Sequence, residues 1–313
     1  MAEVVAVVDT NLEAAKNLAS LLGGINYYET LTDAIRKEDF DAVFITTPTF
    51  THHSLTVEAA EAGNHVFCEK PMALTLKEAD EMISVTKRNN VKLQIGFMRR
   101  FDPEFRRAKS LIDEGVIGKP VLVKSVGRGP GLPPRWALDP KMGLGMVAEV
   151  NSHDFDTLRW FMNDEFKTIY ADAAALLRPD VAEEFPGFHD IVAVIARFQK
   201  GGFGIIDGGC PVNYAYDARV EVLGTEGLIT IGEVQGTSLL VCHKDQKITT
   251  EPFHSWRDRF REAYIAEAES FIKSIIEDRE PEVTGEDGKK ALEATLAAIK
   301  SIKEHKPVEL PIE

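Results

Sequence analysis

The stretch AVFITTPTFTHHSLTVEAAEAGNHVFCEKP, residues 42–71, contains two apolar runs of strand length with a helical pattern between them. The runs are Ala42 to Thr46 and His65 to Cys68, and the helical pattern covers residues 53–62. Parallel strands need a long crossover connection, which is usually a helix. The stretch therefore predicts a βαβ unit, and with it a parallel sheet.

The same alternation of strands and helices runs through residues 1–117. Thr75 and Glu78 have the spacing of a capping box, and Asp102 with Pro103 marks the start of a helix that Gly115 ends. The other elements expected here are strands at Val4 to Val8 and Leu93 to Phe97, and helices at 12–22 and 75–90. We predict a Rossmann-like parallel domain over residues 1–117.

Beyond residue 117, strand-like segments follow one another with turns between them, and two amphipathic helices close the chain. The strands are expected at 120–127, 166–175, 190–198, 202–207, 216–223, 227–231 and 237–242. This order is typical of an antiparallel sheet. The predicted fold class is α/β plus α+β, with an open antiparallel sheet and helices in a second domain at 118–313.

The segment IVAVIARF, residues 191–198, has apolar side chains on both alternate faces of its expected strand. One face should pack on helices, and we expect the other to pack on a partner chain in a homo-dimer or homo-tetramer. The alternative is a sheet that the chain's own helices cover on both sides.

The composition is that of an acidic globular protein. The 313 residues include 36 Lys and Arg against 50 Asp and Glu, which gives a net charge of −14. Such a chain repels phosphate backbones and anionic lipid, so we expect no nucleic-acid or membrane partner. No run approaches the roughly 20 apolar residues of a membrane span, and no basic segment precedes an apolar one at the start. A cytoplasmic location is the expectation.

Three cysteines are too few and too scattered for a disulfide framework or a metal cluster. We expect Cys68, Cys210 and Cys242 to be small buried residues, and we expect no bound metal.

The run Val4 to Val8 ends in Asp9, as does the second strand of a dinucleotide-binding βαβ unit. A carboxylate there accepts hydrogen bonds from the adenosine ribose and repels a 2′-phosphate, and Thr10 and Asn11 follow with no arginine beside them. NAD is therefore preferred over NADP. The alternative is that Asp9 only caps the helix beginning near Leu12.

No Gly-x-Gly-x-x-Gly pattern precedes Asp9, and GLGMVA at 143–148 imitates it without a preceding βαβ strand. A complete domain would begin about 20 to 25 residues earlier with the central strand of the 3-2-1-4-5-6 order. We expect a truncated sequence, in which the strands before Asp9 and after Asp41 are both separated from those at Cys68 and Phe97. The alternatives are that another segment or chain fills the gap, or that dinucleotide binds poorly.

Four motifs spread over almost the whole chain resemble the Gfo/Idh/MocA oxidoreductase family. They are the TPT and EKP segments within TTPTFTHHSLTVEAAEAGNHVFCEKP (46–71), GFMRRFD (96–102), HDFDTLRW (153–160) and VTGEDGKKAL (283–292). GFMRR is most similar to inositol dehydrogenases. The resemblance implies an NAD-dependent enzyme that transfers a hydride between a sugar or cyclitol and the cofactor.

Oxidation of a secondary alcohol needs a base on the hydroxyl and a cation near the forming carbonyl oxygen. The resemblance implies that Lys70 is this cation. Without the flanking motif, the expected role of Lys70 would be that of a solvated lysine in a loop. His153, expected at a helix start after Asn151 and Ser152, is the candidate base. Otherwise it is a hydrogen-bonding residue of the helix terminus. Glu149 stands where the family usually has Asp, and it would orient His153 or the substrate.

Asp154 and Asp156 are expected in the first turn of the same helix, where the helix dipole favours negative charge. This explains both aspartates, and we give them no catalytic role. The resemblance further implies a cofactor site and a substrate site. The cofactor residues would be Asp9, Thr10, Thr47, Pro48, His52, Glu69 and Lys70, and the substrate residues Met98, Arg99, Arg128, Tyr214 and Tyr216. Arg99 and Arg128 would bind either substrate hydroxyls or structural carboxylates, and the sequence favours neither role over the other.

Gly129 stands where inositol dehydrogenases carry an acidic residue, which argues against myo-inositol itself as the substrate. Two other functions are compatible with the motifs: a non-catalytic ligand-binding or regulatory protein of the same family, and a redox-neutral NAD-using glycosidase. A zinc alcohol dehydrogenase is disfavoured because no Cys, His and Glu cluster has ligand spacing.

Overall fold

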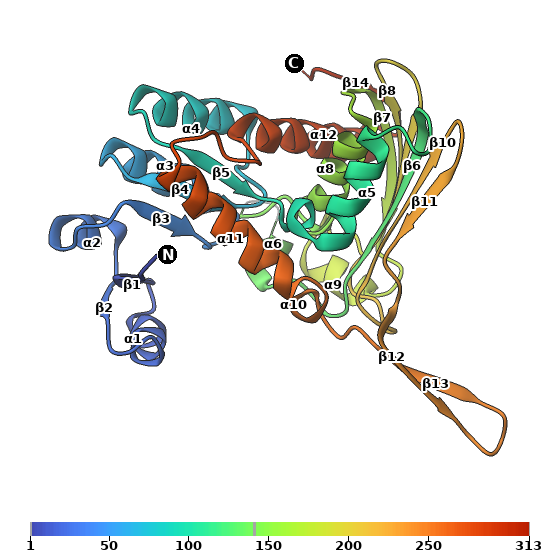
Figure 1. The fold of residues 1–313 in the computed structure, drawn as a ribbon, viewed down its shortest axis with the longest axis horizontal. Helices are drawn as coiled ribbons and strands as arrows, with labels where there is room; N and C mark the ends of the chain where they lie inside the picture. Colours follow the sequence, from blue (N-terminus) through green and yellow to red (C-terminus); the bar gives the residue numbers. More distant parts are fainter. Residues whose placement is uncertain (1, 140–141, 313) are drawn as a thin grey trace. The chain divides into compact units, whose positions relative to one another are not determined.

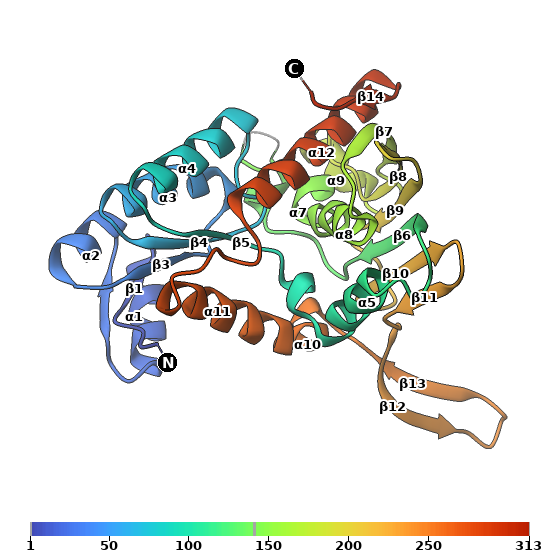
Figure 2. The ribbon, with the colours of Figure 1, turned by 45° about the horizontal axis from the view of Figure 1, so that its top comes forward.

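The computed structural model describes residues 2–139 and 142–312. The chain divides into two compact units, which Figures 1 and 2 show in two views. Unit 1 comprises Met1–Gly96 and Ala268–Glu286, and unit 2 comprises Phe97–Glu267 and Asp287–Glu313. The domain boundary expected at residue 117 falls within unit 2.

Unit 1 contains two separate parallel sheets. In the first, β1 (Ala6–Val8) pairs with β2 (Asn26–Tyr28). The second has the order β3 (Ala42–Ile45), β4 (His65–Glu69) and β5 (Leu93–Gly96). The strand before Asp9 is thus separated from β4 and β5, as predicted. The prediction is wrong for β3, which pairs with β4 because α3 (His52–Glu61) is the crossover that makes them neighbours.

Side-chain caps mark the starts of three unit 1 helices, α1 (Leu12–Leu21), α2 (Leu31–Lys37) and α4 (Leu76–Arg88), whereas α3 follows a 3₁₀ turn without one. At α4, Thr75 Oγ1 accepts a hydrogen bond from the Glu78 N–H at 3.2 Å, and Glu78 Oε2 accepts one from the Thr75 N–H at 3.0 Å. At α1, the cap is Asn11, whose Oδ1 accepts from the Ala14 N–H at 3.2 Å. The alternative role of Asp9 as the helix cap is therefore wrong.

The late segment Ala268–Glu286 completes unit 1. Its residue Thr284 forms a β-bridge with Gln94, and the Ile95 N–H donates to the Val283 carbonyl at 3.2 Å. Phe271 packs edge-on against Phe44, with ring centroids 5.5 Å apart. The start of the VTGEDGKKAL motif therefore lies along β5.

Unit 2 is built on a seven-stranded sheet, in which the strands lie side by side in the order β11-β10-β6-β9-β8-β7-β14 (Figure 1). Its strands are β6 (Pro120–Arg128), β7 (Phe166–Ala174), β8 (Ile191–Phe198), β9 (Phe203–Gly209), β10 (Asp217–Gly224), β11 (Leu228–Ile231) and β14 (Val308–Glu309). The prediction of a purely antiparallel sheet is wrong at one place, because β6 and β9 are parallel. The chain crosses over through helices, β7 and β8 before β9 returns beside β6.

Helices cover one face of this sheet (Figure 2). They are α5 (Pro103–Asp113), α8 (Ser152–Met162) and α12 (Gly285–Glu304). The other helices are α6 (Arg135–Leu138), α7 (Met146–Glu149), α9 (Pro179–Glu184), α10 (Trp256–Arg259) and α11 (Arg261–Ile276), and α11 and α12 also contribute residues to unit 1. Phe155, Leu158 and Phe161 of α8 are fully buried in the same core as Val194 of β8. The core of unit 2 therefore lies between α8 and the inner face of the sheet.

The outer face of the sheet is exposed. Along β8, Val192, Val194 and Ala196 are buried, whereas Ile195 is 52% exposed. The neighbouring strands also carry exposed apolar side chains, namely Tyr170, Phe203, Leu223 and Leu228. Within 2–139 and 142–312, the alternative of a sheet covered on both faces by the chain's own helices is therefore wrong.

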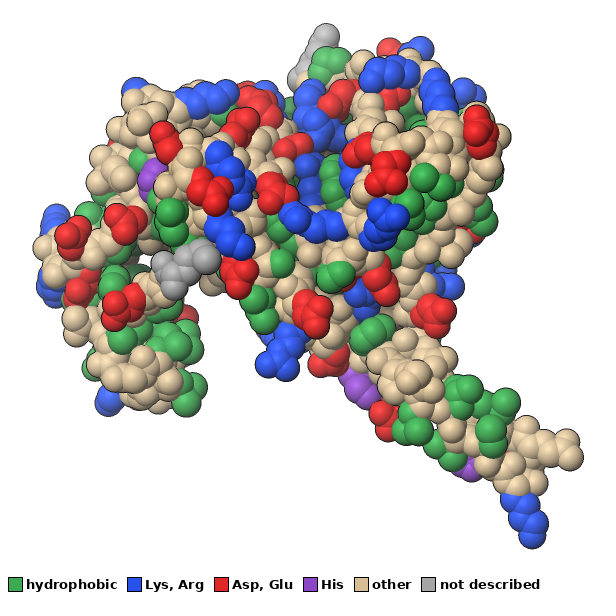
Figure 3. Space-filling model, in the orientation of Figure 1, with side chains coloured by type: hydrophobic (Ala, Val, Ile, Leu, Met, Phe, Trp, Pro, Cys, Tyr) green, Lys and Arg blue, Asp and Glu red, His purple; other side chains and the backbone are tan. Residues whose placement is uncertain are grey.

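A two-stranded hairpin projects from unit 2 (Figures 1 and 3). Its strands, β12 (Gln235–Cys242) and β13 (Ile248–Pro252), pair only with each other. The prediction that all three cysteines are buried is wrong for Cys242, which lies at the end of β12 and is exposed. Cys68 and Cys210 are buried, as predicted.

Among the described residues, no helix is long and apolar enough to cross a membrane. In the same ranges, no group of three or more His, Cys, Asp and Glu side chains is arranged to hold a metal ion.

The exposure of the thiols predicts a simple reactivity pattern. Burial raises the pKa of Cys210 to about 11 and raises that of Cys68 as well, so both thiols stay protonated and inaccessible. Titration of the native protein with Ellman's reagent should show one fast thiol, which Cys242→Ser removes and Cys210→Ser does not. Two or three equally fast thiols would contradict the burial described here.

Candidate functional site

In unit 1, the buried imidazole of His52 links the loops that follow β3 and β4. Its Nε2 lies 2.8 Å from the Thr47 carbonyl oxygen, and its Nδ1 lies 2.8 Å from the Pro71 carbonyl oxygen. Burial lowers the pKa of His52, whereas the two backbone carbonyls, which both accept hydrogen bonds, raise it. Both nitrogens face the protein backbone, so His52 joins the two loops that carry Thr47 and Pro71.

The EKP segment follows directly at the end of β4. Glu69 Oε2 accepts a hydrogen bond from the Lys70 N–H at 3.2 Å, and burial raises the pKa of the Glu69 carboxyl. A Cβ atom at Gly96 would lie only 3.0 Å from this carboxyl group. The glycine of GFMRRFD, Gly96, therefore leaves room for Glu69, and Lys70 is half-buried at the carboxyl end of β4.

The residues of unit 1 suit the adenosine and nicotinamide ends of NAD. Asp9 is exposed at the end of β1, and its Oδ1 accepts only from the Asn11 N–H at 2.8 Å among the hydrogen bonds described, which leaves carboxylate lone pairs for ribose hydroxyls. Thr10 and Thr47 are also exposed, and Pro48 is half-buried. The Thr47 hydroxyl lies 2.6 Å from the Thr51 hydroxyl, which holds the loop after β3 against α3.

In unit 2, His153 lies in the first turn of α8 and is largely buried. The edge of its ring contacts Phe97, with centroids 5.8 Å apart and planes at 80°. Glu149, on the preceding short helix α7, is half-buried. The structure therefore places His153 in contact with Phe97, and Glu149 lies on α7, the helix before α8 in the chain.

Asp154 has a role that the sequence analysis missed. Its Oδ1 accepts from Arg99 Nη1 and from the Ser125 hydroxyl, each at 2.6 Å, and its Oδ2 accepts from Asn151 Nδ2 at 2.7 Å. All four side chains are buried. The explanation of Asp154 by the helix dipole is thus insufficient, and Asn151 binds this carboxylate instead of capping α8 with its side chain.

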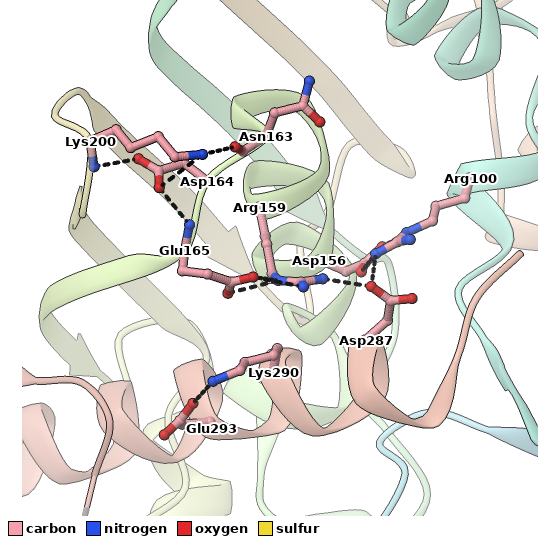
Figure 4. Close-up of polar contacts among 10 residues, drawn as sticks. All are labelled: Arg100, Asp156, Arg159, Asn163, Asp164, Glu165, Lys200, Asp287, Lys290 and Glu293. Carbon is pink, nitrogen blue, oxygen red and sulfur yellow. Dashed lines mark hydrogen bonds and ion pairs between the residues drawn. The ribbon is translucent and has the colours of Figure 1, made fainter.

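The next residue pair extends into a buried charge network (Figure 4). Asp156 accepts from Arg100 Nε at 2.9 Å and from Arg100 Nη2 at 2.6 Å. Asp287 of α12 accepts from Arg100 at 3.1 Å and from Arg159 at 2.6 Å, and Arg159 also pairs with Glu165 at 2.8 Å. The dipole explanation is insufficient for Asp156 as well. Asp287 belongs to VTGEDGKKAL, so three of the four motifs meet in this network.

The five expected substrate residues are not gathered at one place. Met98 and Arg99 are buried, and Tyr216 is a further hydrogen-bond partner of Arg99. Arg99 therefore binds a structural carboxylate, which was one of its two expected roles.

Arg128 and Tyr214 lie on the other side of the sheet. Ser125 faces Asp154 on the inner side, whereas Arg128, an odd number of residues along β6, points outward. Its Nε donates to Asp207 at 3.0 Å, and its Nη1 donates to the Tyr214 hydroxyl at 3.2 Å. Successive side chains of a strand point to opposite faces, and this alternation is the sequence signal that places Arg128 away from the inner face.

Comparisons with known proteins agree with these motifs. Residues 1–97 match the model of an oxidoreductase family with an NAD-binding Rossmann fold, and residues 105–230 match that of the Gfo/Idh/MocA C-terminal domain. The chain is 33% identical to the myo-inositol 2-dehydrogenase of Thermotoga maritima over 305 residues, which are 97% of this chain and 90% of that protein. The chain belongs to the Gfo/Idh/MocA oxidoreductase family.

Other members of the Gfo/Idh/MocA family are similar over the same length. The scyllo-inositol 2-dehydrogenase (NAD(+)) of Bacillus subtilis is 33% identical over 312 residues, which are 99% of this chain and 90% of that protein. The structure of Lactobacillus casei scyllo-inositol dehydrogenase with bound NAD(H) and scyllo-inositol has a TM-score of 0.90 at 26% identity, covering 98% of this chain and 91% of that one. These matches confirm the predicted fold class and an NAD-dependent oxidoreductase. The non-catalytic alternative gains no support from them.

The buried charge network predicts an unequal cost for two neighbouring arginines. Arg100→Met leaves Asp156 buried without its bidentate partner, so unfolding free energy in urea should fall by about 3–5 kcal/mol. The control is Arg107→Met on α5, whose pair with Glu114 at 3.5 Å is exposed and should cost about 1 kcal/mol or less. Equal losses for the two variants would contradict the assigned network.

Proposed function

We propose that this enzyme oxidises a secondary hydroxyl of a cyclitol or sugar. The observation that carries the proposal is the identity of 33% over nearly the whole chain to inositol 2-dehydrogenases, with Lys70 and His153 present within the matching motifs. Gly129 stands in place of an acidic residue, which favours a cyclitol or sugar other than myo-inositol. A cytoplasmic location stays a prediction.

His153 acts as the base that takes the proton of the reacting hydroxyl. Its ring is held on one edge by Phe97, and a histidine has its ordinary pKa near working pH. The Lys70 ammonium stabilises the negative charge that develops on the oxygen as the proton leaves. Glu149 orients His153 or binds a second substrate hydroxyl. When bound, NAD accepts the hydride from the carbon that carried the hydroxyl.

The cofactor site is formed by the loops of unit 1. Asp9 and Thr10 bind the adenosine ribose, and the absence of an adjacent arginine favours NAD over NADP. Thr47, Pro48 and Glu69 border the nicotinamide, and His52 holds the loops that carry them. Met98 and Tyr216 remain proposed as substrate residues, and Arg99 acts through Asp154. Arg128 and Tyr214 contact each other on the other side of the sheet, so we do not place them in the same site.

The role of Lys70 predicts a specific loss of turnover. With a panel of inositols and sugars and with NAD, Lys70→Met should lower kcat/KM by about 100-fold or more, because the developing oxyanion loses its cation. NAD binding, followed by tryptophan fluorescence, should persist.

Lys77→Met, at an exposed position in the first turn of α4, is the matched control and should keep full activity. Undiminished turnover by Lys70→Met would contradict the assignment.

We further propose that the outer face of the seven-stranded sheet packs on a second copy in a homo-dimer or homo-tetramer. The apolar side chains Ile195 of β8 and Phe203 of β9 are exposed on two paired strands, and Leu228 is exposed on β11 of the same sheet. Exposed apolar side chains on one face of a sheet are typical of an interface between copies. Ile195→Glu should therefore shift the mass in sedimentation equilibrium to that of the monomer.

Leu21→Glu on α1, at a side chain that is 84% exposed, is the control and should keep the oligomer. A wild-type monomer at micromolar concentration, or an oligomer unchanged by Ile195→Glu, would overturn this part of the proposal.

A further inference from the structure

The segment GFMRRFD lies beside the first turns of α8, and three of its residues each contact one residue of that helix. Phe97 contacts the ring of His153, Arg99 pairs with Asp154, and Arg100 pairs with Asp156. We propose that the Arg99–Asp154 pair is a positioning device that sets the orientation and the proton affinity of His153. This inference rests on the proposed function, because it assumes that His153 is the base.

The geometry fixes Asp154 on several sides. Its carboxylate has three donors at 2.6 to 2.7 Å, one from the 3₁₀ helix Met98–Phe101, one from β6 and one from the residue just before α8. A Cβ atom at Gly127 would lie 2.1 Å from Asp154 Oδ2, so the strand meets the carboxylate closely. His153 is the preceding residue in the backbone, and a fixed Asp154 therefore holds the turn that carries the imidazole.

The charges of the pair cancel beside the imidazole. Asp154 alone would favour an imidazolium at His153, and Arg99 alone would oppose it, because electrostatic interactions are strong where little water screens them. The elements packed against this turn, α7, the 3₁₀ helix and β6, and the nearby loop carry few other titratable groups within the described ranges. These groups are Glu149, Arg100, Asp156 of α8 itself and Tyr216, together with Lys124 and Arg128 of β6 and Asp207 of β9, which also contacts α8. Lys124 and Arg128 lie an odd number of residues from Ser125 and therefore point to the other face of the sheet. Removing one partner of the pair should shift the protonation of His153 in a direction set by the charge that remains.

A purely structural role for the pair makes a different prediction, and the chain provides a matched comparison. Arg100–Asp156 joins the same two elements with the same residue types and is equally buried. Asp156 lies three residues from His153 along α8, whereas Asp154 is its direct neighbour, and Arg100 also pairs with Asp287. Both pairs should support folding, but only Arg99–Asp154 should control the base.

The test is the pH dependence of kcat/KM, whose acid limb reports deprotonation of the base. Arg99→Met should move this limb to higher pH by about one unit, and Asp154→Asn should move it to lower pH by a similar amount. The double variant Arg99→Met with Asp154→Asn should return the limb toward that of the wild type. Arg100→Met and Asp156→Asn should leave it in place.

The conservative variant Arg99→Lys keeps the charge but not the planar fork, so it should keep the limb and lose mainly kcat. A second readout does not need turnover: the NMR titration of the His153 ring, assigned with His153→Gln, should show the same opposite shifts. If the wild type oxidises no cyclitol or sugar, the proposed function fails while the NMR shifts still test the inference. Shifts of one sign in both single variants, or none in either, would overturn it.

Discussion

Arg99 and Arg100 are adjacent and buried, and a buried guanidinium is stable only where carboxylates and other acceptors replace its water. Asp154 and Asp156 of α8 supply these carboxylates, Asp154 to Arg99 and Asp156 to Arg100. Asp287 joins the second arginine to α12. This constraint determines where the first turn of α8 lies in unit 2, and with it the position of His153.

A second constraint acts in unit 1 on the loops at the carboxyl ends of β3 and β4. His52 spans the two loops through its ring nitrogens, and Gly96 leaves the space that Glu69 occupies. The backbone of Lys70 is therefore held on one side by the Glu69 carboxyl, which accepts from the Lys70 N–H, and on the other by the contact of the Pro71 carbonyl with His52. Each unit thus presents one of the two proposed reacting groups from a framework of buried polar contacts, with small residues wherever these contacts are close.

Much of this organisation could be predicted from local patterns. The capping box at Thr75, the helix start at Asp102 and most strands of the second half were found because periodicity and turn residues are local signals. The strands β2, β13 and β14 were missed because they are short, exposed or without alternation. The parallel pairing of β6 with β9 depends on the path of the chain and has no local signal.

The site was predicted less completely than the fold. Lys70 and His153 stay predictions from the motifs. The partners of Arg99 and Arg100 lie more than fifty residues away and could not be paired from one sequence. Arg128 was grouped with Arg99 as a substrate residue, although strand alternation places it on the other face from Ser125. Cys242 was taken as buried because the isolated hairpin that exposes it had not been foreseen.

The central claim is that Lys70 and His153 act on the same hydroxyl group. A crystal structure of the enzyme with NAD and a cyclitol that it oxidises tests this claim most directly. The account predicts one hydroxyl oxygen within about 3 Å of both Lys70 Nζ and a His153 ring nitrogen, with its carbon facing the nicotinamide. A reacting hydroxyl that contacts neither side chain, or only one of them, would contradict it.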